Sequence, residues 1–206
     1  MSDAETSEDA ADGRRLPLGE GGYELGPKLA SGGMAELFLA ERVGPCGVRH
    51  PVVVKRLREE MLGDRTVVRM FVWEAWISSR LRHPHIVRFH DVVVVGGRHH
   101  LVLEYVEGCD LARLVKHVWR AGAQVPLLVA VDVAIAAARA LDHAHRLRDD
   151  EGRSIGLVHR DVSPHNIVCS LAGEVKIIDF GVAKTTRVPR DTGAGLIKGK
   201  LGYHAP

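Results

Sequence analysis

The sequence lacks the features that mark disulfide-rich, secreted and membrane-spanning chains. It has 206 residues and only three cysteines, at positions 46, 109 and 169, which are scattered, odd in number and form no C-x-x-C pair. This favours a reduced, cytosolic setting. No uninterrupted apolar run approaches the ~18–20 residues of a membrane span. The first residues show neither the basic nor the apolar region of a secretory signal. We therefore expect a cytoplasmic protein with no membrane span in this chain.

A strong excess of either charge is also missing. The chain carries 28 Lys and Arg against 26 Asp and Glu, which leaves a net charge of +2. Such a small charge points neither to nucleic acid nor to a membrane surface as a partner, so we expect no nucleic-acid binding. The hydrophobic fraction of 46% is enough to build a core. The length fits one large domain or two small lobes.

Two short motifs carry the chemistry. Residues 159–166 read H-R-D-V-S-P-H-N, and residues 179–181 read D-F-G. In this order, with a short strand pair between them, the motifs resemble the catalytic and metal-binding loops of a eukaryotic-like protein kinase. The resemblance implies transfer of a phosphoryl group, which depends on positioning and charge neutralisation. Asp161 is then the candidate carboxylate that faces the attacking hydroxyl, while Asp179 and Asn166 offer the oxygen ligands that Mg²⁺ prefers.

The resemblance runs from Tyr23 to the last residue and implies an α+β, bilobal protein-kinase-like fold. It implies a first lobe over residues 23–106, with a five-stranded antiparallel sheet and one regulatory helix. A partial helical second lobe over residues 107–206 would hold the catalytic loop, D-F-G and the activation loop. Residues 1–22 are acidic and then Gly-rich, so we expect a disordered leader there.

A Gly-rich turn joins the first two predicted strands, Tyr23–Leu29 and Glu36–Ala40. Glycines let backbone N–H groups approach phosphates without interference from Cβ. The kinase loop usually reads G-x-G-x-x-G-x-V; here Ala30 and Ala35 replace the outer glycines and Leu37 replaces the valine. An ordinary hairpin turn is the alternative for this segment taken alone. The A-S-G-G-M-A-E pattern is similar to that of bacterial Hanks-type serine/threonine kinases.

A lysine and a glutamate are candidates for a buried pair. Residues 51–55 read P-V-V-V-K and match the V-A-I-K strand of the family. Apolar residues at helical spacing predict a helix over Thr66–Leu81. Glu74 lies on its apolar face, where a carboxylate is costly unless it is paired. The resemblance implies that Lys55 pairs with Glu74 and also contacts the α- and β-phosphates. A surface glutamate on an amphipathic helix is the alternative.

Residues 103–108, L-E-Y-V-E-G, end a predicted hairpin and look like the hinge between kinase lobes. The resemblance implies that Leu103 is the gatekeeper and that the backbone of Glu104 and Val106 meets the adenine edge. The whole set expected to bind the nucleotide is Leu29, Ala30, Ser31, Gly32, Gly33, Leu37, Val53, Lys55, Leu103, Glu104, Val106, Asp110 and Val168.

Two helices are predicted for the second lobe. Asp110 could contact the ribose or cap the helix Leu111–Arg120, and both roles stay open. A longer helix begins near Pro126 and ends near Arg146. We expect its core face to consist of Leu127, Val131, Ala134, Ile135, Ala138 and Leu141. The histidines of the chain form no ligand set at metal spacing, so we expect no metal role for them.

The sequence departs from the family at two positions that we interpret together. Ser163 stands where the family has the lysine that neutralises the γ-phosphate, and Lys200 stands where it has the threonine of G-T-x-x-Y-x-A-P-E. We hypothesise that the two groups have exchanged places, which makes both catalytic candidates beside Asp161, Lys55, Glu74 and Asn166. Two independent substitutions in a degraded enzyme are the alternative.

Three threonines occupy the position of the activation loop: Thr185, Thr186 and Thr192. They are candidates for self-phosphorylation, because Arg160 beside Asp161 could pair with a phosphothreonine and order the loop.

The resemblance implies an ATP- and Mg²⁺-dependent protein kinase that transfers the γ-phosphate to serine or threonine hydroxyls of proteins. Two observations keep alternatives open. The sequence stops inside A-P-E, which allows a truncated, catalytically silent nucleotide-binding or regulatory module. Ser163 replaces the lysine that marks serine/threonine preference, so tyrosine is not excluded. A small-molecule kinase of the aminoglycoside type fits the motifs less well.

Overall fold

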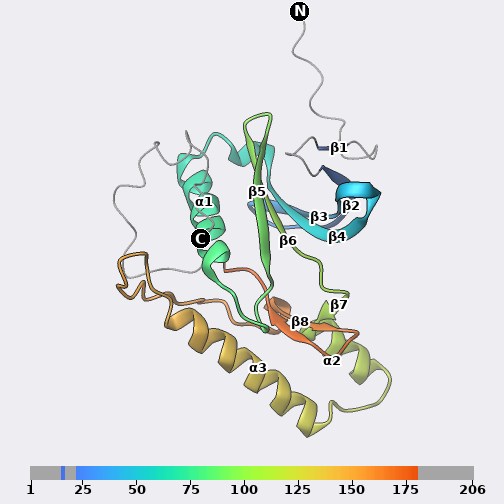
Figure 1. The fold of residues 1–206 in the computed structure, drawn as a ribbon. Helices are drawn as coiled ribbons and strands as arrows, with labels where there is room; N and C mark the ends of the chain where they lie inside the picture. The colour runs from blue at the N-terminus through green and yellow to red at the C-terminus, as the bar shows by residue number, and fades with distance from the viewer. Residues whose placement is uncertain (1–14, 17–21, 181–206) are drawn as a thin grey trace, which may run out of the picture.

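The computed structural model describes residues 15–16 and 22–180. These residues form two antiparallel sheets and three α-helices, arranged as two lobes (Figure 1). The first sheet and α1 make one lobe, and the second, smaller sheet makes the other with α2 and α3. The predicted bilobal α+β fold is therefore confirmed.

The first sheet has the strand order β1-β2-β3-β4-β6-β5. Its strands are β1 (Arg15–Leu16), β2 (Tyr23–Ser31), β3 (Ala35–Val43), β4 (Arg49–Leu57), β5 (Phe89–Val95) and β6 (Arg98–Glu104). The five predicted strands are all present. The two-residue β1 lies inside the segment predicted as a disordered leader and pairs with Tyr23 and Glu24. This strand was not predicted from the sequence.

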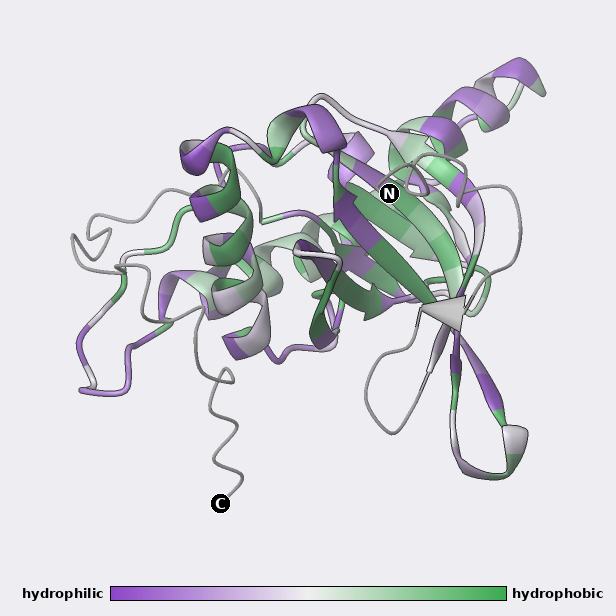
Figure 2. Ribbon diagram, turned by 90° about the horizontal axis from the view of Figure 1, so that it is seen from above, coloured by the Kyte–Doolittle hydropathy of each residue, from purple (hydrophilic) through white to green (hydrophobic). Residues whose placement is uncertain are grey.

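Alternation along β4 gives the first sheet two different faces. Val52 and Val54 are buried on one face with Phe38 of β3. The other face carries Leu57, which packs with residues of α1. Because side chains alternate along a strand, Lys55 lies on this second face, beside the helix. Figure 2 shows the hydrophobic residues concentrated along the strands at the centre of the molecule.

The helix α1 (Arg65–Arg80) begins at Asp64, whose side chain accepts hydrogen bonds from Thr66 N and Val67 N. Such a cap satisfies donors that have no partner within the helix. The buried residues Phe71, Glu74, Ala75 and Ile77 follow helical spacing and face the sheet and the second lobe.

The second lobe begins at the hinge and alternates short strands with helices. Its elements are β7 (Gly108–Asp110), α2 (Leu111–Arg120), α3 (Leu127–His145), β8 (Ile167–Ser170) and β9 (Val175–Ile177), and short 3₁₀ turns lie at Pro45–Gly47, Glu59–Met61 and Pro164–Asn166. The second sheet has the order β7-β8-β9. Among the described residues, no helix combines the length and apolar character needed to span a membrane.

The core face of α3 differs from the predicted one. The buried residues are Val133, Ala136, Ala137, Ala140 and Ala144. The predicted face is exposed instead, with 77% of Leu127 and 44% of Ile135 accessible, and Leu141 is half-buried. The helix is apolar around most of its circumference, so periodicity does not select one face. Small alanine side chains let the helix approach β9 and Leu157 closely.

Backbone hydrogen bonds join the loop after α1 to the second sheet. Ile177 N donates to His85 O over 2.9 Å, and Val87 N donates to Ile177 O over 3.0 Å. Ile86 forms a parallel bridge with Ile177. Ile86 also belongs to the hydrophobic core of the second lobe, together with Ile77 of α1. This loop is therefore packed into the lobe that carries the catalytic motifs.

Candidate active site

A cation lies between two carboxylates where the two lobes meet. Lys55 Nζ on β4 is 2.5 Å from Glu74 Oε1 on α1 and 3.1 Å from Asp179 Oδ1, which follows β9. The side chains of Lys55 and Glu74 are nearly buried, while that of Asp179 is about half exposed. The predicted pairing of Lys55 with Glu74 is present, and the alternative of a surface glutamate is excluded.

Burial and charge act together on this group. Burial raises the pKa of Glu74, although the ammonium of Lys55 opposes the change. For Lys55 burial acts downward, but the carboxylates of Glu74 and Asp179 outweigh it and raise the pKa of the amine. Lys55 therefore stays protonated and presents a fixed positive charge beside Glu74 and Asp179.

Asn166 holds Asp161 in place within the catalytic loop. Its Nδ2 donates to Asp161 Oδ2 over 2.8 Å and to Asp161 O over 2.9 Å. Asn166 N donates to Ser163 O over 2.9 Å, which closes the 3₁₀ turn at Pro164–Asn166. Because the amide nitrogen is engaged, the amide oxygen is the remaining ligand atom of Asn166. Asn166 O accepts from Ile178 N, so the loop is tied to the segment that leads to Asp179.

His159 locks the catalytic loop to the residues around Asp179. Only 1% of its surface is accessible, and its ring packs edge-on against Phe180 with 4.6 Å between centroids. Asp161 N donates to His159 Nδ1, so Nδ1 is the acceptor and Nε2 carries the proton that is directed at Ile178 O. This buried imidazole was not singled out from the sequence, although it belongs to the H-R-D motif.

Backbone strain marks both motifs. Arg160 has φ 66° and Asp179 has φ 62°, and the third non-glycine residue with positive φ among the described residues is Cys46. This left-handed region is unfavourable for a side chain as long as that of arginine. Such strain costs about 1–3 kcal/mol and persists where the surroundings impose it, as they often do at functional sites. Arg160 directly precedes Asp161, which Asn166 contacts, and Asp179 is itself a partner of Lys55.

Apolar side chains form a wall beside Lys55. The register places Leu37 opposite Lys55 and Val53 opposite Leu103. All four residues therefore lie on the same face of the sheet. On the other side of the cleft, Val168 of β8 is half-buried and pairs with Asp110. These residues come from both lobes and belong to the set predicted to bind the nucleotide, which stays a prediction.

The Gly-rich turn is shorter than predicted. β2 continues through Ala30 to Ser31, and β3 begins at Ala35. The turn is closed by a bond from Gly32 N to Ala35 O over 2.8 Å. Leu29, predicted to contact the nucleotide, is half exposed.

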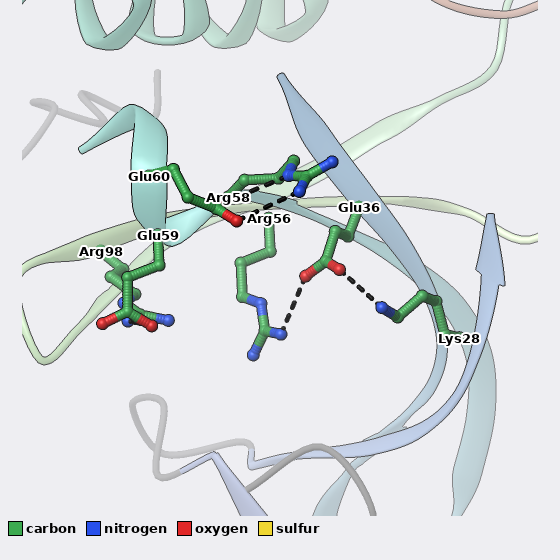
Figure 3. Close-up of polar contacts among 7 residues, drawn as sticks. All are labelled: Lys28, Glu36, Arg56, Arg58, Glu59, Glu60 and Arg98. Carbon is green, nitrogen blue, oxygen red and sulfur yellow. Dashed lines mark hydrogen bonds and ion pairs between the residues drawn. The ribbon is translucent and has the colours of Figure 1, made fainter. Parts of the chain in front are cut away.

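Ion pairs brace the strands on either side of this turn. Glu36 of β3 accepts from Lys28 over 2.6 Å and from Arg56 over 3.1 Å, so it links β2 to β4 (Figure 3). The hydrogen bond from Lys28, although burial opposes it, lowers the pKa of Glu36. Arg58–Glu60 and Arg98–Glu59 pairs lie nearby in the same view (Figure 3). The turn is therefore held between braced strands.

Asp110 caps α2. Its Oδ1 accepts from Arg113 N over 2.8 Å, and Asp110 is the N-cap residue. The capping role is therefore present, and contact with a ribose remains a prediction. His165 Nδ1 lies 3.8 Å from the same oxygen.

The hinge contains a side-chain contact that sequence reasoning missed. Glu104 was expected to act through its backbone, but its Oε1 accepts from Lys176 Nζ over 2.7 Å. Its Oε2 accepts from Arg88 N over 2.9 Å, and Glu104 N donates to Arg88 O. Lys176 is only 8% accessible. A lysine within the apolar strand V-K-I-I was the available signal, since such a lysine needs a partner when buried.

Two cavities lie near the hinge. The smaller one, of about 20 Å³, lies behind Leu103 between Glu74, Asp179 and Phe180. The larger one, of about 570 Å³, is lined by the loop after α1, with Glu104 and Lys176 in its wall. The lining of this cavity does not include Lys55, Asp161 or Asn166, so the cavity is separate from the candidate catalytic groups.

The described residues fit Mg²⁺ bound through few protein ligands. No cluster of three or more His, Cys, Asp or Glu side chains among them is arranged to hold a metal. Mg²⁺ commonly uses one or two carboxylates together with substrate phosphates and water. The carboxylate of Asp179 and the amide oxygen of Asn166 supply ligands of that kind. Lys200, Thr185, Thr186 and Thr192 lie outside the described residues.

The chain is similar in sequence to several bacterial protein kinases. The chain is 37% identical over 208 residues to the tyrosine-protein kinase MasK of Myxococcus xanthus, across 100% of this chain and 32% of that protein. It is 30% identical to the serine/threonine-protein kinase PrkC of Bacillus subtilis, across 94% of this chain and 27% of the relative. It is 35% identical to the serine/threonine-protein kinase PknA of Mycobacterium tuberculosis, across 90% and 41%. The chain thus spans less than half the length of these relatives.

A solved structure and a family model agree with these matches. The crystal structure of the Mycobacterium tuberculosis PknI kinase domain superposes with a TM-score of 0.61 at 30% identity, over 79% of this chain and 60% of that one. The model of the protein kinase domain matches residues 23–206. The resemblance to bacterial Hanks-type kinases is confirmed, and the chain belongs to the protein kinase family.

Proposed function

We propose that this chain transfers the γ-phosphoryl group of ATP to a serine or threonine hydroxyl of a protein. The observation that carries the proposal is the meeting of three segments at one point. Lys55 lies between Glu74 and Asp179, while Asn166 holds the carboxylate of Asp161. The chain spans less than half the length of its named relatives, so the proposed activity rests on the geometry of this site.

Each group has a role set by its contacts. The ammonium of Lys55 binds the α- and β-phosphates, and Glu74 holds that ammonium in position. Asp161 faces the acceptor hydroxyl and receives its proton. The bond from the γ-phosphorus to the β,γ-bridging oxygen breaks as the acceptor oxygen bonds to phosphorus, and ADP leaves. Asp179 and Asn166 would hold Mg²⁺, which would supply positive charge to neutralise the phosphates.

The apolar wall binds the base. Leu37, Val53, Leu103 and Val168 enclose the adenine, and the backbone of Glu104 and Val106 pairs with its edge. The ion pair of Glu104 with Lys176 supports this arrangement, because it fixes the strand that leads into the hinge.

The named relatives differ in the acceptor. The relatives PrkC and PknA are named serine/threonine-protein kinases, whereas MasK is named a tyrosine-protein kinase. We propose serine or threonine, with Lys200 supplying charge near Asp161 and Ser163 supplying the hydroxyl. Self-phosphorylation at Thr185, Thr186 or Thr192 belongs to the same proposal. We also propose that the protein acts in the cytoplasm.

The first test is nucleotide binding by the purified chain. A ligand that binds only the folded state at a hundredfold excess over Kd adds about 2.7 kcal/mol to its stability. We expect MgATP to raise the Tm of the chain and to leave that of Asp179→Asn nearly unchanged. No rise in the unmodified chain would contradict the proposed site.

The second test is transfer itself. Radiolabelled ATP is supplied with a protein mixture, and the labelled residues are identified by mass spectrometry. We expect phosphoserine and phosphothreonine, and loss of label in Asp161→Asn. Labelled tyrosine alone would overturn the acceptor preference. ATP binding without transfer would favour the silent nucleotide-binding module.

A further inference from the structure

Two cysteines stand directly opposite each other on neighbouring strands. Cys109 of β7 is the Cα partner of Cys169 of β8, with Asp110 paired to Val168 one position further along. Directly opposite residues of antiparallel strands have Cβ atoms about 4.5–5.5 Å apart. A disulfide needs Cβ atoms about 3.5–4.5 Å apart and Cα atoms about 4.4–6.8 Å apart. A local movement of about 1 Å is therefore enough to join the two sulfurs.

The two strands approach each other unusually closely at this place. A Cβ on Gly108 would lie 2.1 Å from Cys169 O and 2.8 Å from Ser170 Cα. Only glycine permits such an approach. The ladder continues on the same side through the bond from Leu171 N to Glu107 O, at 2.8 Å. This bond makes Glu107 and Leu171 a hydrogen-bonded pair, and alternation makes Cys109 and Cys169 the next such pair, with Cα atoms about 5.5 Å apart, within the range of a disulfide.

Both thiols are free and partly accessible. Cys169 packs against the core of the second lobe, and direct pairing puts Cys109 on the same face of the sheet. β7 is an edge strand of that sheet within the described part of the chain, and Cys109 is partly accessible there. Burial raises the pKa of the Cys169 thiol, and negative charge on Cys109 raises it further. The second effect reflects the nearness of the two sulfurs.

We propose that Cys109 and Cys169 form a redox modification site, which peroxide converts into a reversible disulfide between β7 and β8. One thiolate attacks a peroxide oxygen, which breaks the O–O bond and gives a sulfenic acid and water. The other thiolate then attacks the sulfenic sulfur, the S–S bond forms, and a second water leaves. In sum, two thiols lose two electrons and two protons, and one hydrogen peroxide becomes two waters. A dithiol reductant reverses the change by exchange.

The disulfide acts on the floor of the proposed nucleotide site. Asp110 directly follows Cys109 in the chain, and Val168 directly precedes Cys169. Because side chains alternate along a strand, Asp110 and Val168 lie on the opposite face of the sheet from the cysteines. Drawing β7 toward β8 displaces Asp110, which also begins α2. We expect a severalfold rise in KM for ATP on oxidation. This consequence rests on the proposed function, whereas the disulfide itself does not.

The disulfide is tested on the purified chain with hydrogen peroxide, followed by digestion without reduction. We expect the free thiols to fall from three to one, a linked peptide pair containing Cys109 and Cys169, and complete recovery with dithiothreitol. We expect Tm to rise by about 5–10 °C, because the bond closes a long loop of the unfolded chain. Oxidation of Cys46 alone, or disulfides only between chains, would overturn the proposal.

Matched variants separate this site from general thiol chemistry. Cys46→Ser removes an exposed thiol far along the sequence and should leave the linked peptide and the rise in Tm intact. Cys169→Ser should abolish both while leaving the sulfenic acid trappable at Cys109. If oxidised Cys46→Ser forms the disulfide but keeps its KM for ATP, the link stands and its effect on the nucleotide site is refuted. If no variant binds ATP at all, the proposed function fails and the disulfide result is unaffected.

Discussion

The buried Lys176 of β9 and the half-buried Glu104 at the end of β6 form an ion pair that connects the two sheets of the protein. The glutamate also accepts from Arg88 N, so both of its oxygens are engaged. The pair therefore joins the second sheet, the hinge and the strand region after α1. Removal of this ion pair should therefore lower the stability of both lobes.

Lys176→Met should destabilise the chain by about 1–3 kcal/mol, because it leaves the half-buried Glu104 carboxylate without its cation. Urea unfolding measures the loss. Lys116→Met on the exposed side of α2 is the control and should change stability by less than about 0.5 kcal/mol. The double variant Lys176→Met with Glu104→Leu should recover much of the loss, since a well-packed apolar pair often replaces a buried ion pair. Equal losses in the single and double variants would contradict this account.

Acid should weaken the same contact. Burial acts to raise the pKa of Glu104, but the hydrogen bonds from Lys176 and Arg88 N outweigh it, and the pKa lies below its ordinary value of 4.5. A carboxyl with a lowered pKa in the folded state stabilises the fold above its unfolded pKa, and this stabilisation is lost as pH falls through the folded pKa. Unfolding followed from pH 7 downward should show a loss of stability below about pH 4.5 that is smaller in Glu104→Gln. Parallel pH profiles for the two proteins would contradict the assignment.

Glu74→Gln should lower kcat by about 100-fold while leaving the fold intact. The ammonium of Lys55 keeps Asp179 as its partner, so it is not left unpaired, but it loses the group that fixes its position. Steady-state kinetics and circular dichroism make the measurement. Glu60→Gln, which removes an exposed carboxylate of the same lobe, is the control and should keep its activity. An active Glu74→Gln would remove Glu74 from the proposed machinery.

His159→Ala should destabilise the chain by about 3 kcal/mol, because it removes a fully buried ring and its contact with Phe180. His165→Ala is the control, since that ring is largely exposed. Thermal unfolding distinguishes them. A similar Tm for the two variants would show that the buried imidazole is not a structural anchor.

Gly108→Ala should lower the folding stability of the chain although it adds only one methyl group. The added Cβ meets the backbone of β8 and no flexible side chain, so the strands must separate. Gly63→Ala has open space around its Cβ and no positive φ, and it is the matched control. We expect a loss of about 1–3 kcal/mol for Gly108→Ala and almost none for Gly63→Ala.

The strands and the helix of the first lobe could be predicted from the sequence because the spacing of their apolar residues fits one secondary structure in each case. In β4, alternation buries Val52 and Val54 and leaves Lys55 on the other face, next to α1. The apolar spacing of α1 indicates that Glu74 needs a partner, and the resemblance to the kinase family identified Lys55 as that partner. Local pattern and long-range contact agree here, so the pair was predictable.

Other features depend on contacts that no local pattern specifies. The face of α3 was predicted wrongly because Ile135 and Ala136 are both apolar, and only packing against β9 selects between them. The pair of Lys176 with Glu104 joins residues 72 positions apart whose separate contexts suggest no partner. The strand β1 has two residues, too few for any periodicity.

The hydrogen bonds of Ile177 with His85 and Val87 have a mechanical consequence. They attach the end of α1 and the loop after it to the second sheet, so this part of the first lobe cannot turn independently of the catalytic motifs. An opening of the cleft would then rotate the β2–β6 sheet about two joints, one at the hinge after Glu104 and one at the entry to β5. The helix α1 would then be drawn between two cores, because Phe71 and Ala75 pack with the first sheet and Ile77 packs with the second lobe.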